Sequence, residues 1–140
     1  MSHLNNGACP QCELILNKFP NFNTELRNWF HEVQALHPEC HASECGRGKI
    51  DQERDFQKRA SRAHYLQSAH NYGCAIDLFV LLPGEKTIYP IKWFVDVLMP
   101  NLPKWITWLG APHSKFPELP HIELSNWKNL VKQGIAKPVE

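Results

Sequence analysis

Two short segments of the chain contain residues whose types and spacing are suited to binding a metal ion. In the first segment His70 precedes Asp77, and in the second Glu118 precedes His121 by three residues. Imidazole nitrogens and carboxylate oxygens are zinc ligands, and a catalytic zinc site uses three protein ligands with a fourth position open for water. We therefore predict that His70, Asp77 and His121 bind Zn²⁺ and that Glu118 is a spare carboxylate beside them.

The position of Asp77 in the sequence supports this prediction. It stands near the start of an apolar run, residues 75–82, whose length and content of β-branched and aromatic residues predict a buried strand. An ionised carboxylate without a partner in such a setting costs several kcal/mol, so a cation or hydrogen-bond donors must lie nearby. His70 is the nearest candidate ligand, and Gly73 marks the place where the chain must turn to bring the two side chains together.

The second segment must bend if Glu118 and His121 are to approach the same centre. Pro117 and Pro120 disfavour a helix here. A flat strand would point residues three apart to opposite faces. We therefore expect a bend at Leu119 and Pro120, with Glu118 just outside the ligands and against the metal-bound water.

Together these residues resemble the signature of the LAS metallopeptidases, zinc enzymes that cut D-Ala-D-Ala or L-Ala-D-Glu bonds in bacterial cell-wall peptides. The signature is Ser-x-His-x-x-Gly-x-Ala-x-Asp followed by an acid-x-x-His. Every position is filled, by Ser68, His70, Gly73, Ala75, Asp77, Glu118 and His121. Within the family the chain looks most like the L-alanyl-D-glutamate endopeptidase domains of phage endolysins, over residues 23–124.

The resemblance implies a role for each of these residues. His70, Asp77 and His121 are the implied zinc ligands, and Glu118 is the implied acid/base. Zinc lowers the pKa of its bound water toward about 7, and a carboxylate within reach passes the water proton to the leaving amine. Each ligand histidine should also donate its second ring N–H to an oxygen, for which Glu123 or a backbone carbonyl would serve His121.

Two further roles follow from the same resemblance. Arg47 is the implied stabiliser of the oxyanion, although its Gly-Arg-Gly context departs from the Tyr-Arg-Ser context of the family. Ser68 is implied to shape the loop or bind substrate. His113, just upstream of Glu118, and Trp108 are expected to contact substrate because of their positions near the site, and Trp108-Leu-Gly110 departs from the Trp-Gly-Gly of the endolysins.

The resemblance leaves three functions open. The first is an endolysin that hydrolyses the L-Ala-D-Glu bond of the peptidoglycan stem peptide. The second is a D-Ala-D-Ala carboxypeptidase or dipeptidase with the same metal site. The third is a zinc-binding module without catalysis, similar to the hedgehog signalling domain, against which the presence of Glu118 argues.

Length, charge and apolar content limit the classes of protein to which the chain can belong. With 140 residues, 43% of them hydrophobic, the chain supports one catalytic domain over residues 1–140, and we expect a monomer. A net charge of +1 argues against a dedicated nucleic-acid binder. No apolar stretch approaches a membrane span, and the N-terminus lacks the layout of a signal peptide. We expect synthesis in the host cytoplasm, and the resemblance implies that the protein reaches the cell wall after membrane permeabilisation.

The chain has five cysteines, an odd number, at Cys9, Cys12, Cys40, Cys45 and Cys74. Cys9 and Cys12 have the spacing of half a structural zinc site, which Cys40 with His41, or Cys45, would complete. Reduced thiols, a second metal and a disulfide all remain open, with reduced thiols favoured, and we expect Cys74 to serve only in packing.

Mixed helical and strand patterns predict an α+β fold with a small antiparallel sheet. One face of the sheet should be covered by helices and the other open as a zinc-site cleft, as in hedgehog and DD-peptidase folds. The first expected element is a helix over 25–36, capped at Asn23 and Thr24, with Leu26, Phe30 and Val33 on its buried stripe. The others, in order, are a strand over 41–44, a helix over 51–63, a strand over 75–82 with a hairpin partner at 86–89, a helix over 91–99, extended chain at 105–108, a last strand over 121–124 and a helix over 126–132 capped by Ser125.

Overall fold

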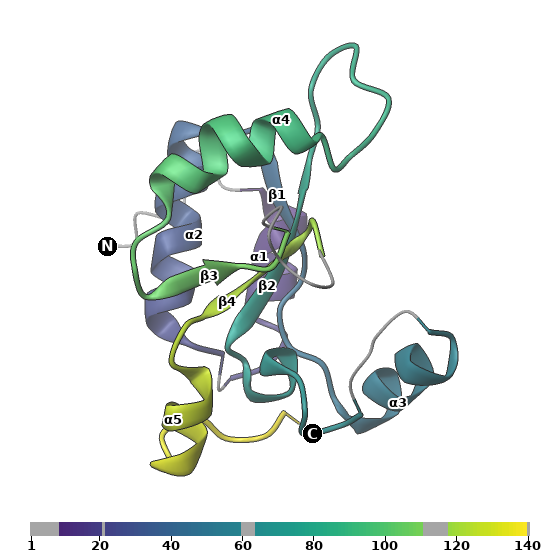
Figure 1. Cartoon of the computed structure of the whole chain (residues 1–140), viewed down its shortest axis with the longest axis vertical. Helices are drawn as coiled ribbons and strands as arrows, with labels where there is room; N and C mark the ends of the chain where they lie inside the picture. Colours follow the sequence, from purple (N-terminus) through teal and green to yellow (C-terminus); the bar gives the residue numbers. More distant parts are fainter. Residues whose placement is uncertain (1–8, 21, 60–63, 111–117, 140) are drawn as a thin grey trace.

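The fold is α+β and is built on a four-stranded antiparallel sheet. The computed structural model describes residues 9–20, 22–59, 64–110 and 118–139. The strand order is β1-β2-β4-β3 (Figure 1). The strands are β1 (Cys40–Glu44), β2 (Ala75–Val80), β3 (Ile106–Trp108) and β4 (His121–Leu124). The predicted fold class is confirmed.

The register of the sheet separates an apolar face from a polar one. In β2, Ile76, Leu78 and Val80 are fully buried, whereas Asp77 between them is half-buried. Asp77 is directly opposite His121 of β4, so their side chains leave the sheet on the same face. The alternation along the strand therefore places the apolar residues in the core and Asp77 beside His121.

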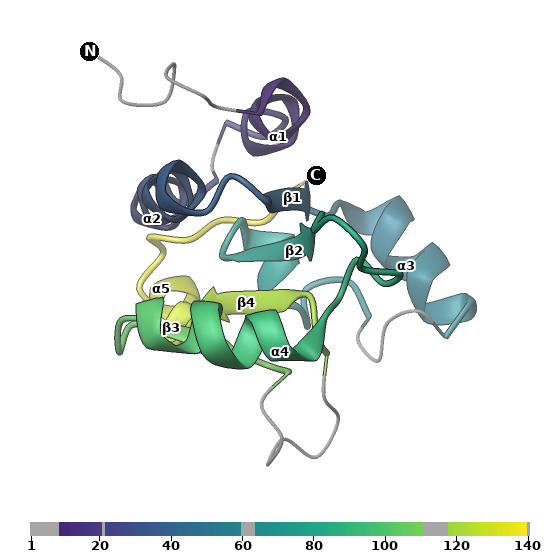
Figure 2. The same ribbon diagram turned by 90° about the horizontal axis from the view of Figure 1, so that it is seen from above.

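Two N-terminal helices, α1 (Pro10–Leu16) and α2 (Thr24–Leu36), lie beside β1 (Figure 2). Helix α2 begins as predicted, because the side chain of Asn23 accepts a hydrogen bond from the N–H of Leu26 at 2.9 Å. The predicted apolar face of this helix is buried, and it consists of Leu26, Phe30 and Val33. Helix α1 was not predicted.

The helix expected over 91–99 is present, although only its first turn is α-helical. Helix α4 (Ile91–Trp93) continues as the π-helical turn η3 (Phe94–Leu98) and the 3-10 turn η4 (Met99–Asn101). The ring of Phe94 stacks on Trp108 with 5.6 Å between centroids, which packs this helix against β3.

Two further short helices lie outside the part of the fold described so far. Helix α3 (Lys49–Gln57) stands apart from the sheet, and α5 (Trp127–Lys132) follows β4 (Figure 1). The cap of α5 is Asn126, so the prediction of Ser125 is wrong. The Ser125 hydroxyl bonds instead to that of Thr107, at 2.7 Å, and therefore joins the ends of β3 and β4.

Two further expectations need correction. Residues 86–89 form no strand, because β2 already has β1 and β4 as neighbours. The segment is joined to β2 by a hydrogen bond in which the N–H of Val80 donates to the carbonyl of Ile88, at 2.8 Å. Helix α3 begins two residues before the predicted start and ends at Gln57, while residues 60–63 lie outside the described part of the chain. Among the described residues no helix is long and apolar enough to cross a membrane.

Candidate metal centre

The loop before β2 holds His70 in place. His70 lies in the 3-10 turn η2 (Ala69–Tyr72), and the hydroxyl of Ser68 caps this turn by accepting from the N–H of His70 at 3.2 Å. Asn71 completes a capping box by accepting from the N–H of Ser68 at 3.1 Å. Gly73 then adopts a left-handed conformation with φ 67°, so the chain turns where the sequence predicted.

The predicted bend before His121 is also present. Leu119 and Pro120 form a turn that is closed by the N–H of His121 donating to the carbonyl of Glu118, at 3.1 Å. The buried indole of Trp108 donates its N–H to the carbonyl of Leu119 at 2.8 Å and fixes the turn from the core side. His121 therefore enters β4 from a rigidly held turn.

These elements bring the three predicted ligands together. Nε2 of His70 lies 3.0 Å from Oδ1 of Asp77, and Nδ1 of His121 lies 3.3 Å from the same oxygen. One ligand atom from each residue lies within 4.8 Å of the other two. A tetrahedral zinc ion with bonds of about 2.0–2.2 Å would separate a nitrogen and an oxygen ligand by roughly 3.4 Å. The three side chains are therefore close to the spacing that one ion requires.

Hydrogen bonds on the outer side of each imidazole fix its orientation. Nδ1 of His70 donates to the carbonyl of Cys45 at 3.0 Å, and Nε2 of His121 donates to Glu123 at 2.7 Å. The other oxygen of Glu123 accepts from the indole N–H of Trp127, at 3.0 Å. Because each proton is held on the outer nitrogen, the inner nitrogens can offer lone pairs to a metal. Of the two partners expected for His121, Glu123 or a backbone carbonyl, the structure shows Glu123.

Burial and mutual attraction set the charge of the centre. Burial would raise the pKa of Asp77, but the imidazoles of His70 and His121 outweigh it and hold that pKa well below its usual range. Burial would lower the pKa of His121, but hydrogen bonds to Asp77 and Glu123 raise it to about 9. The raised pKa of His121 therefore favours a positively charged ring beside the Asp77 carboxylate at neutral pH.

Arg47 lies next to the centre but is engaged mainly elsewhere. Its Nε donates to Glu44 at 2.8 Å, and its Nη1 donates to Gln52 at 3.0 Å. Nη2 is 3.8 Å from Oδ2 of Asp77, at the limit of an ion pair. Oδ1 of Asp77 faces the two histidines instead, so Arg47 supplements rather than replaces them. A role for Arg47 in catalysis stays a prediction.

The other predicted site residues that the structure describes are not among the three side chains that meet at the centre. Glu118 is exposed, and it is not among the three residues whose ligand atoms lie within 4.8 Å of one another. The Ser68 hydroxyl is used as a helix cap, and Trp108 is packed in the core. His113 lies outside the described residues. The substrate contacts of Ser68, His113 and Trp108 stay predictions.

Asn71 is a buried residue of the site that sequence reasoning missed. Its Nδ2 donates to the carbonyl of Arg47 at 2.9 Å and to the side chain of Gln52 at 3.1 Å. These bonds tie the turn that holds His70 to the start of α3 and to Arg47. No spacing rule identifies such a link, although the asparagine three residues after Ser68 fits a capping box.

The centre is chemically suited to a divalent metal ion. Two imidazoles with their outer nitrogens hydrogen-bonded, together with one carboxylate, are a donor set used for zinc and for other transition metals. The described groups need no rearrangement beyond small shifts to surround an ion. The geometry is thus compatible with a metal without identifying which one.

Comparison with known proteins finds a likeness in structure alone. No family model matches the sequence, and a search of curated proteins finds no match. Among solved structures, the fold is similar to the L-Ala D-Glu endopeptidase ChiX of Serratia marcescens, with a TM-score of 0.64 and 16% sequence identity. The match covers 86% of this chain and 90% of that chain. At this identity the likeness shows that the two proteins share a fold.

Proposed function

We propose that this protein is a zinc-dependent peptidoglycan endopeptidase that hydrolyses the L-Ala-D-Glu bond of the stem peptide. The observation that carries the proposal is the convergence of His70 Nε2 and His121 Nδ1 on one oxygen of Asp77. The sequence signature that these residues share with the LAS metallopeptidases supports it, as does the similarity in fold to an L-Ala D-Glu endopeptidase.

His70, Asp77 and His121 would hold the zinc ion. When bound, zinc would lower the pKa of a water molecule toward about 7 and polarise the scissile carbonyl. The histidines act as neutral ligands, because Cys45 and Glu123 keep their protons on the outer nitrogens. His121 would therefore release to solvent the proton that it shares with Asp77 when it holds an ion.

Glu118 is the proposed acid/base. Its carbonyl closes the turn that leads into His121, and its side chain is exposed, which supports a role for this carboxylate beside the centre. In the reaction water adds to the alanine carbonyl carbon, the carbon–nitrogen bond breaks, and Glu118 transfers the water proton to the departing amine of D-Glu. Arg47 is the cation beside Asp77 that would stabilise the oxyanion, a contribution of about 3 kcal/mol for a well-placed donor.

Lysis of a bacterial host by a phage is the biological setting that we propose. The similarity of the signature to phage endolysins supports this setting. The protein would be made in the host cytoplasm and would act on the wall as a monomer after the membrane is permeabilised.

The test is digestion of purified peptidoglycan by the zinc-loaded protein, followed by mass spectrometry of the fragments. The expected products carry a new alanine carboxyl terminus and a new glutamate amine. Release of free D-Ala would instead identify a carboxypeptidase, and intact peptidoglycan would contradict a hydrolase of the wall.

A variant separates catalysis from metal binding. Glu118→Gln should lower the cleavage rate by about 10²–10⁴ while zinc content stays unchanged. Glu85→Gln makes the same chemical change at an exposed residue of the loop between β2 and α4 and should keep full activity. If Glu118→Gln cleaves as fast as the parent, the proposed role of Glu118 is wrong.

A further inference from the structure

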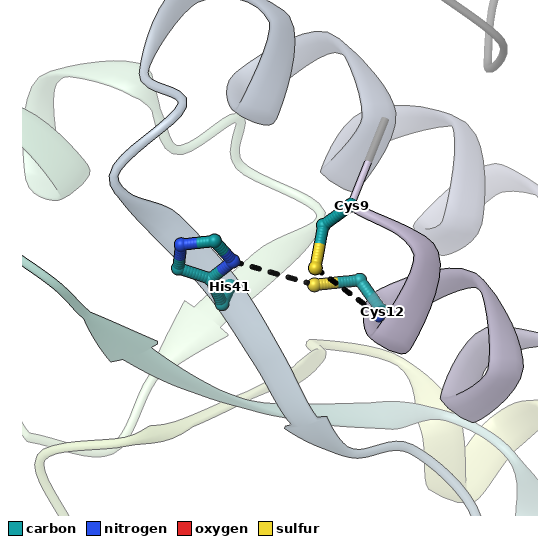
Figure 3. Close-up of side chains that lie close together, drawn as sticks. All are labelled: Cys9, Cys12 and His41. Carbon is teal, nitrogen blue, oxygen red and sulfur yellow. Dashed lines mark hydrogen bonds between the residues drawn. The ribbon is translucent and has the colours of Figure 1, made fainter. Parts of the chain in front are cut away.

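A second cluster of metal-ligand atoms lies at the edge of the sheet, apart from the first centre. It consists of Sγ of Cys9, Sγ of Cys12 and Nδ1 of His41, all within 4.8 Å of one another. Figure 3 shows the two sulfur atoms of the α1 segment and the imidazole of β1 pointing toward one point. None of these residues takes part in the proposed hydrolysis.

The start of α1 holds the two sulfur atoms on one turn. Cys9 is the N-cap of this helix, with Pro10 as its first residue, and its Sγ accepts a hydrogen bond from the N–H of Cys12 at 3.3 Å. The spacing of two residues between the cysteines is the spacing found in structural zinc sites. The turn therefore presents both sulfur atoms on the side that faces β1.

The distance to the imidazole fits a shared ion. Nδ1 of His41 lies 3.7 Å from Sγ of Cys12. A tetrahedral zinc ion, with bonds of about 2.3 Å to sulfur and about 2.0–2.1 Å to nitrogen, would separate these ligand atoms by roughly 3.6 Å. The ring of His41 is stacked on Phe79 with 5.2 Å between centroids, which holds Nδ1 toward the sulfur atoms.

Two N–H groups donate to the sulfur of Cys12. Cys12 is 1% exposed, and its Sγ accepts from the N–H of Ala42 at 3.3 Å and from Nε2 of Gln34 at 3.4 Å. Bonds from N–H groups to a thiolate are the outer contacts that tune a metal–sulfur site. Gln34 also accepts from the N–H of Cys9 at 3.3 Å, so one α2 side chain contacts both cysteines.

A disulfide accounts for fewer of these observations. All five cysteines are free in the structure. A bond between Cys9 and Cys12 would use both sulfur atoms but would give the imidazole of His41 no reason to face them. Thiolate and imidazole ligands together favour zinc among the common divalent metals.

We propose that Cys9, Cys12 and His41 bind a structural zinc ion that fastens α1 to strand β1. Each cysteine releases its thiol proton to solvent as its sulfur bonds to the ion, and the oxidation state of zinc does not change. The three side chains leave the fourth tetrahedral position to water or another ligand. Because α1 has seven residues, too few to be stable alone, the ion would contribute directly to its docking.

Cobalt substitution tests this site separately from the first centre. Co²⁺ bound by thiolates shows a sulfur-to-metal charge-transfer absorption, which His70, Asp77 and His121 cannot produce. The reduced parent protein should show this band, and Cys12→Ser should lose it. Cys74→Ser removes a buried thiol outside the cluster and should keep the band.

Zinc content gives a second readout. The parent should hold two zinc ions per chain and Cys12→Ser one, and the remaining ion would show that the variant is folded. His41→Gln should weaken zinc binding at this site by at least about tenfold. Absence of the band in the parent, equal zinc content in Cys12→Ser, or a Cys9–Cys12 disulfide in protein prepared under reducing conditions would overturn the proposal. Unchanged affinity in His41→Gln would overturn the assignment of His41.

Discussion

Glu123 is the residue through which the proposed zinc affinity can be tested without removing a ligand. Its carboxylate accepts two hydrogen bonds, from Nε2 of His121 at 2.7 Å and from the indole N–H of Trp127 at 3.0 Å. Glu123→Gln has the same shape but only one acceptor oxygen. One of the two buried N–H groups must then face the amide NH₂. His121 therefore loses the negative charge of the carboxylate in every case, and in one of the two amide orientations it also loses its hydrogen-bond acceptor.

The size of the effect follows from this loss. Removal of an outer partner of a ligand histidine weakens metal affinity by about 10–100-fold, which corresponds to about 1.4–2.7 kcal/mol. The unsatisfied N–H should also lower the free energy of unfolding by about 1–3 kcal/mol. Both changes should appear together, because the same carboxylate serves both donors.

The assay is competition for zinc with a chromophoric chelator. It is carried out in the Cys12→Ser background, so that the second cluster does not contribute. Glu85→Gln in the same background is the matched control and should bind zinc like its parent. A dissociation constant for Glu123→Gln within about threefold of the control would refute the assignment of Glu123 as the partner that orients a zinc-binding His121.

Three other predictions test different parts of the structure. Asp77→Asn should lose most zinc from the first centre, as measured by metal analysis of the dialysed protein, and retention of that ion would exclude Asp77 as a ligand. Gly110→Ala should lower the melting temperature, because a Cβ there would lie 2.5 Å from the indole of Trp108, with an expected loss of about 1–3 kcal/mol by chemical denaturation; an unchanged transition would contradict the packing. Burial raises the pKa of Cys74 to about 12, so this thiol should resist alkylation at pH 8 in the folded protein and react once it is unfolded, and rapid labelling of the native protein would show that the site opens.

The ligands were predictable because local rules constrain them. A charged residue in the apolar run of β2 demands a partner, and Gly73 and Pro120 mark the turns that bring His70 and His121 to it. The pairing of His70 with Asp77 depends on residues close in the sequence, whereas His121 comes from a distant segment and was predicted from the need for a third ligand and from the family signature. The structure places all three side chains together, as expected.

The surroundings of the ligands were not predictable in the same way. The carbonyl of Cys45 serves His70, and a backbone carbonyl has no signature in the sequence. The indole of Trp127 reaches Glu123 only because α5 follows directly after β4. Glu123 itself could be named in advance, since residues two apart in a strand share a face with His121.

The helices and strands also differ in how far local sequence predicts them. Helix α2 was predicted because Asn23 caps it and an apolar stripe follows. Helix α1 is short, and its buried residues, Cys12 and Leu16, are too few to show a period. The expected hairpin at residues 86–89 failed because β4, from much later in the chain, occupies that side of β2.

Anomalous diffraction at the zinc absorption edge, from crystals of the zinc-loaded protein, tests the central claim most directly. We predict a peak within about 2.0–2.2 Å of His70 Nε2, His121 Nδ1 and an oxygen of Asp77. A map with no peak between these atoms, and with Asp77 paired to Arg47 instead, would contradict the account.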